Sequence, residues 1–239
     1  MDQEKTIIQT YQEKGTVKEF DSMRWRYEYQ RYKHQIEISF LKKTLKKHNA
    51  KIKILDVACG TGRMLETVAK VRPLSKYYGL DTSKTMINEL NKKAKKIKFK
   101  TNLKIADATK IPYKDNYFDV VYTYHLLWHL PEKTQKKILK EMLRVTKSGG
   151  HIIFDILNKD FIWEKTKDIL NMKKIGGLYK LKVPEVKKFL SKHNCKIEKL
   201  SDFPIKNDSL YSIANVVNKF RKSLPYNLFH MIYFEVKKT

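Results

Sequence analysis

Cysteine is scarce in this sequence. Cys59 and Cys195 are the only two among 239 residues, and they do not form a Cys-x-x-Cys pair. This pattern excludes a disulfide framework and a cysteine-rich zinc site, and it is typical of a reducing compartment. The apolar residues, 41% of the chain, are therefore expected to stabilise the fold through a sizeable hydrophobic core.

Long hydrophobic runs are also missing. No apolar stretch approaches the ~18 residues that a membrane-spanning helix needs. The first residues, MDQEKTIIQTYQEKG, lack the hydrophobic core of a signal peptide. We therefore expect a cytoplasmic protein without integral membrane association, either a monomer or a homodimer.

Acidic residues are half as common as basic ones. The chain has 25 Asp and Glu against 51 Lys and Arg, which gives a formal net charge of +26. Such a charge can indicate a nucleic-acid partner or an anionic membrane. However, the lysines are spread over nearly every segment. Arginine, whose planar guanidinium binds phosphate better than an ammonium does, is scarce. A compositional origin of the charge is favoured, and nucleic acid stays open as a partner.

The pattern of apolar residues changes near residue 50. Residues 19–45 contain no proline or glycine and carry a helical stripe of Ile36, Phe40, Leu41 and Leu45. Short aliphatic runs then alternate with amphipathic stretches, which predicts an α/β fold with a parallel sheet covered on both faces. We expect strands at 53–57, 77–80, 102–106, 118–123, 151–157, 195–203 and 228–236, and helices at 62–71, 83–98, 131–146, 160–172, 184–193 and 208–224.

Three local signals support these boundaries. Ser83 is placed as the N-cap of its helix, and Pro131 lies in the first turn of the next one. Ser148-Gly149-Gly150 is expected to end that helix. We predict a helical extension over 1–50 and a single domain over 51–239, with insertions at about 158–182 and 204–226.

A glycine-rich turn follows the first expected strand in ILDVACGTGRMLE, residues 54–66. It lacks the third glycine of the dinucleotide fingerprint and the Gly-Lys-Ser or Gly-Lys-Thr of a phosphate-binding loop. Asp56, at the mouth of the strand, would repel a pyrophosphate but attract an amine or another cation. Gly60 and Gly62 have no Cβ and let the backbone approach a ligand closely. The turn therefore predicts a cationic ligand without phosphate.

Acids also follow the next two strands. Asp81 ends the run KYYGLD, where an ionised carboxylate can accept two hydrogen bonds from ribose hydroxyls. Asp107, with Ala108 beside it, closes the third strand and can accept from an adenine amino group. Taken singly, each acid has a structural alternative: Asp56 as the cap of the following turn, and Asp81 as the N-cap of its helix. Three acids at the ends of three successive strands favour a ligand site.

Four segments together resemble the class I S-adenosylmethionine-dependent methyltransferases. They are ILDVACGTGRMLE, GLDTSKTM, ADATKIPYKDNYFDVVYTYHLLWHLP and EMLRVTKSGGHIIF. Their sequence pattern is closest to that of the small-molecule and quinone-type branch. The resemblance covers about residues 50–160, with Tyr113 where the family often has phenylalanine. It implies a Rossmann-like, seven-stranded, mostly parallel sheet with an antiparallel edge strand and helices on both faces. The N-terminal helical lid is expected from the residues near position 25, as a docking helix whose start covers the cofactor. The resemblance also implies S-adenosyl-L-methionine as cofactor and S-adenosyl-L-homocysteine as product.

The resemblance assigns roles by motif position. Asp56, Gly60 and Gly62 would surround the methionine moiety, Asp81 would bind the ribose, and Asp107 would contact the adenine edge. The complete expected cofactor set is Asp56, Ala58, Gly60, Thr61, Gly62, Arg63, Asp81, Thr82, Met86, Asp107, Ala108, Thr123 and Tyr124.

Methyl transfer needs a base only if the acceptor must lose a proton. His125 and His129, in YHLLWHLP, are the candidates, and a structural role is the alternative for each. The other histidines show no metal-like spacing, so no metal is expected. Aromatic and basic side chains near residue 25 can stack on a planar acceptor or dock their helix on the sheet. The expected acceptor pocket contains Arg24, Trp25, Tyr27, Tyr124 and His125.

The favoured function is transfer of a methyl group, by in-line displacement, to a small-molecule or lipid-like acceptor. In this fold the insertions after the fifth and sixth strands build the acceptor pocket, and no residue in them identifies the acceptor. An RNA methyltransferase is one alternative, although the chain has YTYHLL where base-amino methyltransferases have Asn-Pro-Pro-Tyr or Asp-Pro-Pro-Tyr. A non-catalytic cofactor-binding subunit is the other.

Overall fold

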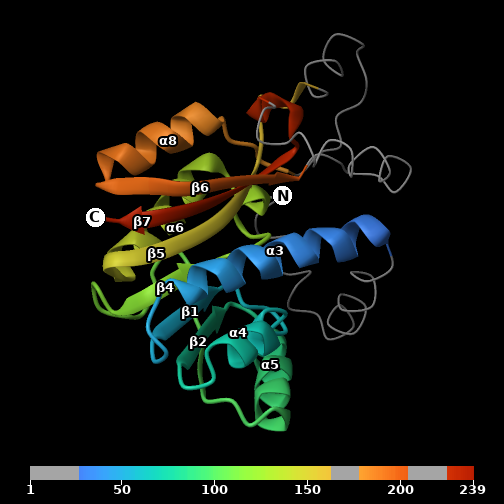
Figure 1. Cartoon of the computed structure of the whole chain (residues 1–239), viewed down its shortest axis with the longest axis vertical. Helices are drawn as coiled ribbons and strands as arrows, with labels where there is room; N and C mark the ends of the chain where they lie inside the picture. The colour runs from blue at the N-terminus through green and yellow to red at the C-terminus, as the bar shows by residue number, and fades with distance from the viewer. Residues whose placement is uncertain (1–26, 163–177, 204–224) are drawn as a thin grey trace.

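The computed structural model describes residues 27–162, 178–203 and 225–239. Within these ranges the strands form one seven-stranded sheet in the order β3-β2-β1-β4-β5-β7-β6 (Figure 1). The strands are β1 (Lys53–Val57), β2 (Lys76–Asp81), β3 (Thr101–Ile105), β4 (Phe118–Tyr122), β5 (Thr146–Leu157), β6 (Cys195–Phe203) and β7 (Met231–Lys238). The helices are α3 (Glu28–Lys46), α4 (Leu65–Val71), α5 (Lys84–Lys96), α6 (Glu132–Val145) and α8 (Val183–Lys192), with short 3₁₀ turns η1 (Leu127–His129) and η4 (Tyr226–Leu228).

The direction of the strands confirms the expected fold class. Strands β1 to β5 pair in parallel, and β7 runs antiparallel to both of its neighbours, β5 and β6. The antiparallel strand thus lies one position inside the edge, with β6 outermost. The chain winds from β1 toward β3 on one side and continues from β4 on the other. The switch point between β1 and β4 is where open α/β sheets bind ligands.

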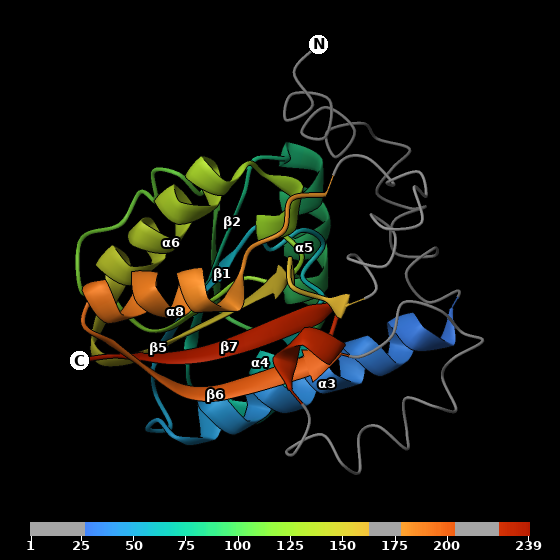
Figure 2. The same ribbon diagram turned by 90° about the horizontal axis from the view of Figure 1, so that it is seen from above.

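Helices cover both faces of the sheet, as expected. In β1, Ile54 packs in the core shared with α3, α4 and α5, whereas its neighbour Leu55 packs in the core shared with α6 and α8. Figure 2 shows α6 and α8 on one side of the sheet and α3 on the other. Because successive strand residues point to opposite faces, uninterrupted aliphatic runs are needed to fill both cores.

Most predicted boundaries lie within a few residues of the observed ones. β1 and β6 span the expected residues, and Ser83 is the N-cap of α5, since its Oγ accepts a hydrogen bond from the Met86 N–H at 3.3 Å. The expected helices at 160–172 and 208–224 fall mostly outside the described residues. None of the helices in the described part is long and apolar enough to cross a membrane.

The predicted bounds of α6, 131–146, lie within one residue of the observed ones, but Ser148-Gly149-Gly150 does not end the helix. The helix ends at Val145 because Thr146 is already extended (φ −80°, ψ 136°), and these glycines lie within β5. Gly149 adopts a positive φ of 77°, and a Cβ on Gly150 would lie 2.8 Å from the Asp119 carbonyl oxygen. The glycines therefore permit close strand contact at an irregularity between β4 and β5, rather than capping the helix.

Candidate functional site

A cavity of about 500 Å³ lies at the carboxyl ends of β1, β2 and β4. It brings together residues from the loops after these strands, the first turns of α3, and the segment around η1. Of the expected cofactor residues, those in its wall are Asp56, Ala58, Gly60, Thr61, Arg63, Asp81, Thr82, Met86 and Tyr124. Tyr27, His125 and His129, expected in the acceptor pocket or in catalysis, also line it.

The loop after β1 needs glycine at two positions. Gly60 and Gly62 have φ angles of 53° and 78°, in the left-handed region that favours glycine. A Cβ on Gly60 would meet nothing within 4 Å, so this position leaves open space beside the cavity. A Cβ on Gly62 would lie 2.8 Å from Leu90 Cγ, so this glycine lets α5 pack closely on the loop.

The two glycines predict different responses to alanine. Gly60→Ala should cost roughly 1–2 kcal/mol, because it adds only left-handed backbone strain. Gly62→Ala should cost roughly 1–3 kcal/mol more, because the Leu90 side chain must also move. Urea unfolding of both variants measures the difference. Equal losses of unfolding free energy would contradict the packing role of Gly62.

Asp56 is a buried acid in the wall of the cavity. Its Oδ2 accepts hydrogen bonds from the hydroxyls of Tyr77 at 2.6 Å and Tyr122 at 2.8 Å. Burial raises the pKa of Asp56 to about 7, against the lowering effect of these two hydroxyls and of Arg63. The Asp56 carboxyl therefore exchanges its proton near pH 7, and a bound cation would favour its ionised form.

Asp81 connects the glycine loop to the start of α5. Its Oδ2 accepts from the Gly60 N–H and its Oδ1 from the Ser83 N–H, each at 2.9 Å. Burial raises the pKa of Asp81, and the backbone hydrogen bonds oppose this. Since Ser83 is the N-cap of α5, helix capping does not account for Asp81. Each carboxylate oxygen has a second acceptor site for a ligand hydroxyl.

Four of the expected cofactor residues are not in the cavity wall: Gly62, Asp107, Ala108 and Thr123. Thr123 is fully buried and donates from Oγ1 to the Val57 carbonyl at 2.8 Å, which ties β4 to β1. Asp107 is exposed, and its Oδ1 accepts from the Thr109 N–H at 2.7 Å. Ala108 packs in the core beneath α6. A role of Asp107 and Ala108 at an adenine edge stays a prediction.

Glu37, on α3, is the residue that sequence reasoning missed. Its side chain is 0% exposed, forms an ion pair with Arg63, and accepts from Tyr233 Oη at 3.1 Å. Burial acts to raise the pKa of Glu37, but Arg63 and the hydrogen bonds from His125 and His34 hold it well below its usual range. This carboxylate therefore joins α3 to the β1 loop and to β7.

A sequence signal for Glu37 does exist. It lies one helical turn before Phe40 and Leu41, on the apolar stripe that docks α3. A charged residue on a core-facing stripe requires a buried partner. The partner could not be named from the sequence, because Arg63 and Tyr233 are 26 and 196 positions away.

The same carboxylate positions His125. The ring Nε2 lies 2.6 Å from Glu37 Oε1, and the backbone N–H donates to Asp155 Oδ1 at 2.8 Å. Because a carboxylate only accepts, Nε2 carries the proton and Nδ1 has the lone pair. Burial, followed by the charge of Lys33, lowers the pKa of His125 to about 3, so the imidazole is neutral. Its φ of 63° is strained for a non-glycine residue, which is typical of functional sites.

The outer wall of the cavity is aromatic and basic. Trp128 donates from Nε1 to Asp155 Oδ2 at 3.1 Å, and its ring lies 4.0 Å from that of His129. Burial and the charge of Lys33 lower the pKa of His129 to about 4. Lys33 and Tyr27 line this part of the cavity from the start of α3. The other two expected pocket residues, Arg24 and Trp25, lie outside the described residues.

Comparison with known sequences finds similarity over the part of the chain that supplies most of the cavity wall. Residues 55–154 match the family model described as a methyltransferase domain. The ubiquinone/menaquinone biosynthesis C-methyltransferase UbiE of Burkholderia cenocepacia (strain HI2424) is 33% identical over 132 residues, which cover 55% of this chain and 50% of the relative. The demethylmenaquinone methyltransferase of Anoxybacillus flavithermus is 35% identical over 120 residues, 48% of this chain and 50% of the relative. The chain thus spans about half the length of the curated relatives it matches.

Solved structures agree on the fold. Magnesium protoporphyrin IX methyltransferase (ChlM) from Synechocystis PCC 6803, with bound SAH, has a TM-score of 0.70 at 17% identity and covers 100% of both chains. Geranyl diphosphate C-methyltransferase from Streptomyces coelicolor A3(2) has a TM-score of 0.63 at 13% identity, over 86% of this chain and 79% of that one. Residues 55–154 are therefore similar to a methyltransferase domain, and the seven-stranded sheet has the fold of these solved structures.

Proposed function

We propose that the chain binds S-adenosyl-L-methionine in this cavity and transfers its methyl group to a small-molecule acceptor. The observation that carries the proposal is the arrangement of Asp56, the Gly60 loop and Asp81 around one cavity at the β1/β4 switch point. Asp56 suits the ligand's ammonium group, Asp81 suits its ribose hydroxyls, and Gly60 leaves space for close approach. These three features match a ligand with cationic and hydroxyl groups.

The relatives support the same proposal. The curated relatives are named for methylation of quinone precursors, and the ChlM structures contain SAH or SAM. All of these proteins are named for small acceptors, namely a quinone, a porphyrin and, in Streptomyces, geranyl diphosphate. A small-molecule acceptor is therefore favoured over RNA for this chain.

The outer wall is suited to hold the acceptor. Tyr27 and Trp128 offer aromatic surfaces for a planar or apolar molecule, and Lys33 offers a positive charge. Methyl transfer from a sulfonium is a displacement in which alignment and exclusion of water supply much of the acceleration. Where the acceptor carries a hydroxyl, we propose that His125, which lines the cavity with its ring held by Glu37, accepts a hydrogen bond from it and orients its oxygen, and that the proton passes to water after the transfer, because a pKa of about 3 makes this imidazole a weak base. The methyl carbon then bonds to the acceptor, and the electron pair of its former bond stays on sulfur.

Binding of the product measures the cofactor site separately from turnover. Asp81→Asn should weaken binding of S-adenosyl-L-homocysteine by about 10- to 100-fold in calorimetry, because charge-assisted hydrogen bonds are lost. Asp115→Asn is the matched control, since Asp115 is 67% exposed and lies outside the cavity. Failure of the wild-type chain to bind either form of the cofactor would overturn the proposal. With binding established, a methyl-labelled cofactor and a panel of quinols, phenols and carboxylic acids would identify the acceptor.

A further inference from the structure

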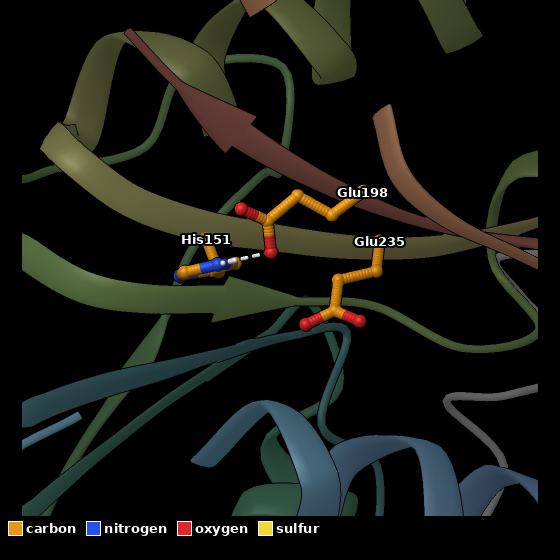
Figure 3. Close-up of side chains that lie close together, drawn as sticks. All are labelled: His151, Glu198 and Glu235. Atoms are coloured by element: carbon orange, nitrogen blue, oxygen red, sulfur yellow. Dashed lines mark hydrogen bonds and ion pairs between the residues drawn. The ribbon is translucent and has the colours of Figure 1, made fainter. Parts of the chain in front are cut away.

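A second group of chemically active side chains lies outside the cavity, on the face of the sheet that α3 covers. His151 on β5, Glu198 on β6 and Glu235 on β7 point toward one another in Figure 3. One ligand atom from each lies within 4.8 Å of the other two. Each strand contributes one donor, so the group exists only because β7 lies between β5 and β6.

The group already holds a cation. Lys47, directly after α3, places its Nζ 2.7 Å from Glu198 Oε2 and 2.8 Å from Glu235 Oε1. Two carboxylates thus share one ammonium, although the Glu235 side chain is only 2% exposed. Lys47 itself is 41% exposed and has a flexible four-carbon stem, so its head can move into solvent. A divalent ion would balance the two carboxylates more completely.

The surrounding contacts resemble the support that metal ligands receive in proteins. His48 Nε2 lies 2.8 Å from His151 Nδ1, which leaves His151 Nε2 directed at Glu198 Oε2 at 3.0 Å. Thr44 donates from Oγ1 to Glu235 Oε1 at 2.7 Å. A second hydrogen bond to the far nitrogen of a histidine, and one to a carboxylate, orient such groups for coordination.

We propose that His151, Glu198 and Glu235 bind a divalent transition-metal ion in competition with the Lys47 ammonium. One imidazole and two carboxylates suit Zn²⁺ and its neighbours in the transition series, whereas Mg²⁺ and Ca²⁺ prefer oxygen ligands alone. Three protein ligands and one water complete a tetrahedral zinc site. The bound ion would link β5, β6 and β7 beneath the end of α3, the helix that carries Glu37. Histidine spacing in the sequence had suggested no metal site, because these residues are far apart along the chain.

Zinc chloride added to the chelator-treated full chain tests this proposal by calorimetry and thermal unfolding. One Zn²⁺ per chain should bind and raise the unfolding temperature, and MgCl₂ at the same concentration should not. Lys47→Met should tighten Zn²⁺ binding by about tenfold or more, because it removes the competing charge. Lys46→Met, one position away and exposed, should bind like the wild type.

Two ligand variants complete the test. His151→Gln should abolish the binding, and Glu198→Gln provides a second variant at the more exposed rim in case the first does not fold. Zinc binding of unchanged affinity in the ligand variant that folds would overturn the site. Equal affinities in the wild type and Lys47→Met would overturn the competition. The proposed methyltransferase function is untouched by either result, since none of these residues lines the cavity.

Discussion

Replacing Glu37 by leucine should lower the free energy of unfolding by about 3–5 kcal/mol, because it leaves the Arg63 guanidinium buried without its ion partner. Hydrogen bonds from His125 and Tyr233 to the same carboxylate are lost as well. Glu37→Gln should lose less, since an amide oxygen still accepts hydrogen bonds. Urea unfolding at pH 7 measures all three proteins.

The control for this prediction lies on the same helix. Glu28 is 63% exposed, and Glu28→Gln should change stability by less than about 0.5 kcal/mol. The pH dependence gives a second check. Because the pKa of Glu37 is lower folded than unfolded, its contribution to stability is present above the ordinary pKa of 4.5 and is lost as the pH falls through the folded pKa. A loss below 1 kcal/mol in Glu37→Leu at pH 7 would contradict the role of Glu37 as a buried link.

Asp56→Asn should weaken binding of S-adenosyl-L-homocysteine by about 10- to 100-fold at pH 7.5, because the charge-assisted contact with the ligand's ammonium is lost. The wild-type affinity should itself fall by about five- to tenfold between pH 7.5 and pH 6, as the Asp56 carboxyl, whose pKa is about 7, takes up a proton. In Asp56→Asn this dependence should disappear. Calorimetry at the two pH values gives both results.

The unfolding temperature of Asp56→Asn shows whether weaker binding comes from the lost ligand contact or from a less stable fold. The pKa of Asp56 is higher in the folded state, about 7, than its ordinary 3.8, so between these values the folded state binds the extra proton. Stability from this group therefore falls as the pH rises through that window, and Asp56→Asn should unfold at a higher temperature than the wild type at pH 7.5. Weaker binding together with a lower unfolding temperature would contradict the assignment.

The sequence was a good guide to elements with local causes. β1 was predicted at its observed residues because an aliphatic run ends there in an acid and a glycine turn. Ser83 was found because an N-cap depends on the next three residues alone. The role of Gly149 and Gly150 was mistaken because glycine is favoured both after a helix and at a close strand contact, and only the pairing of β5 with β4 distinguishes the two.

The candidate site also contains residues that local sequence predicts and contacts that only the fold reveals. Asp56 and Asp81 were predicted because parallel strands carry their carboxyl ends to one edge of the sheet, so position along each strand determines which residues meet. The expected set also contained Thr123, whose hydroxyl instead bonds the Val57 carbonyl. Motif position places Thr123 at this end of the sheet, and its contact with the cofactor stays a prediction.

The sequence by itself determined the alternation of strands and helices, the glycine turn and the acids at the strand ends, because each depends on neighbouring residues. Only the tertiary structure decided which distant groups neutralise one another. Glu37 meets His125 across 88 positions, and His48 meets His151 across 103. A buried charge is stable only beside its partner, and the packing of α3 on the sheet selects that partner.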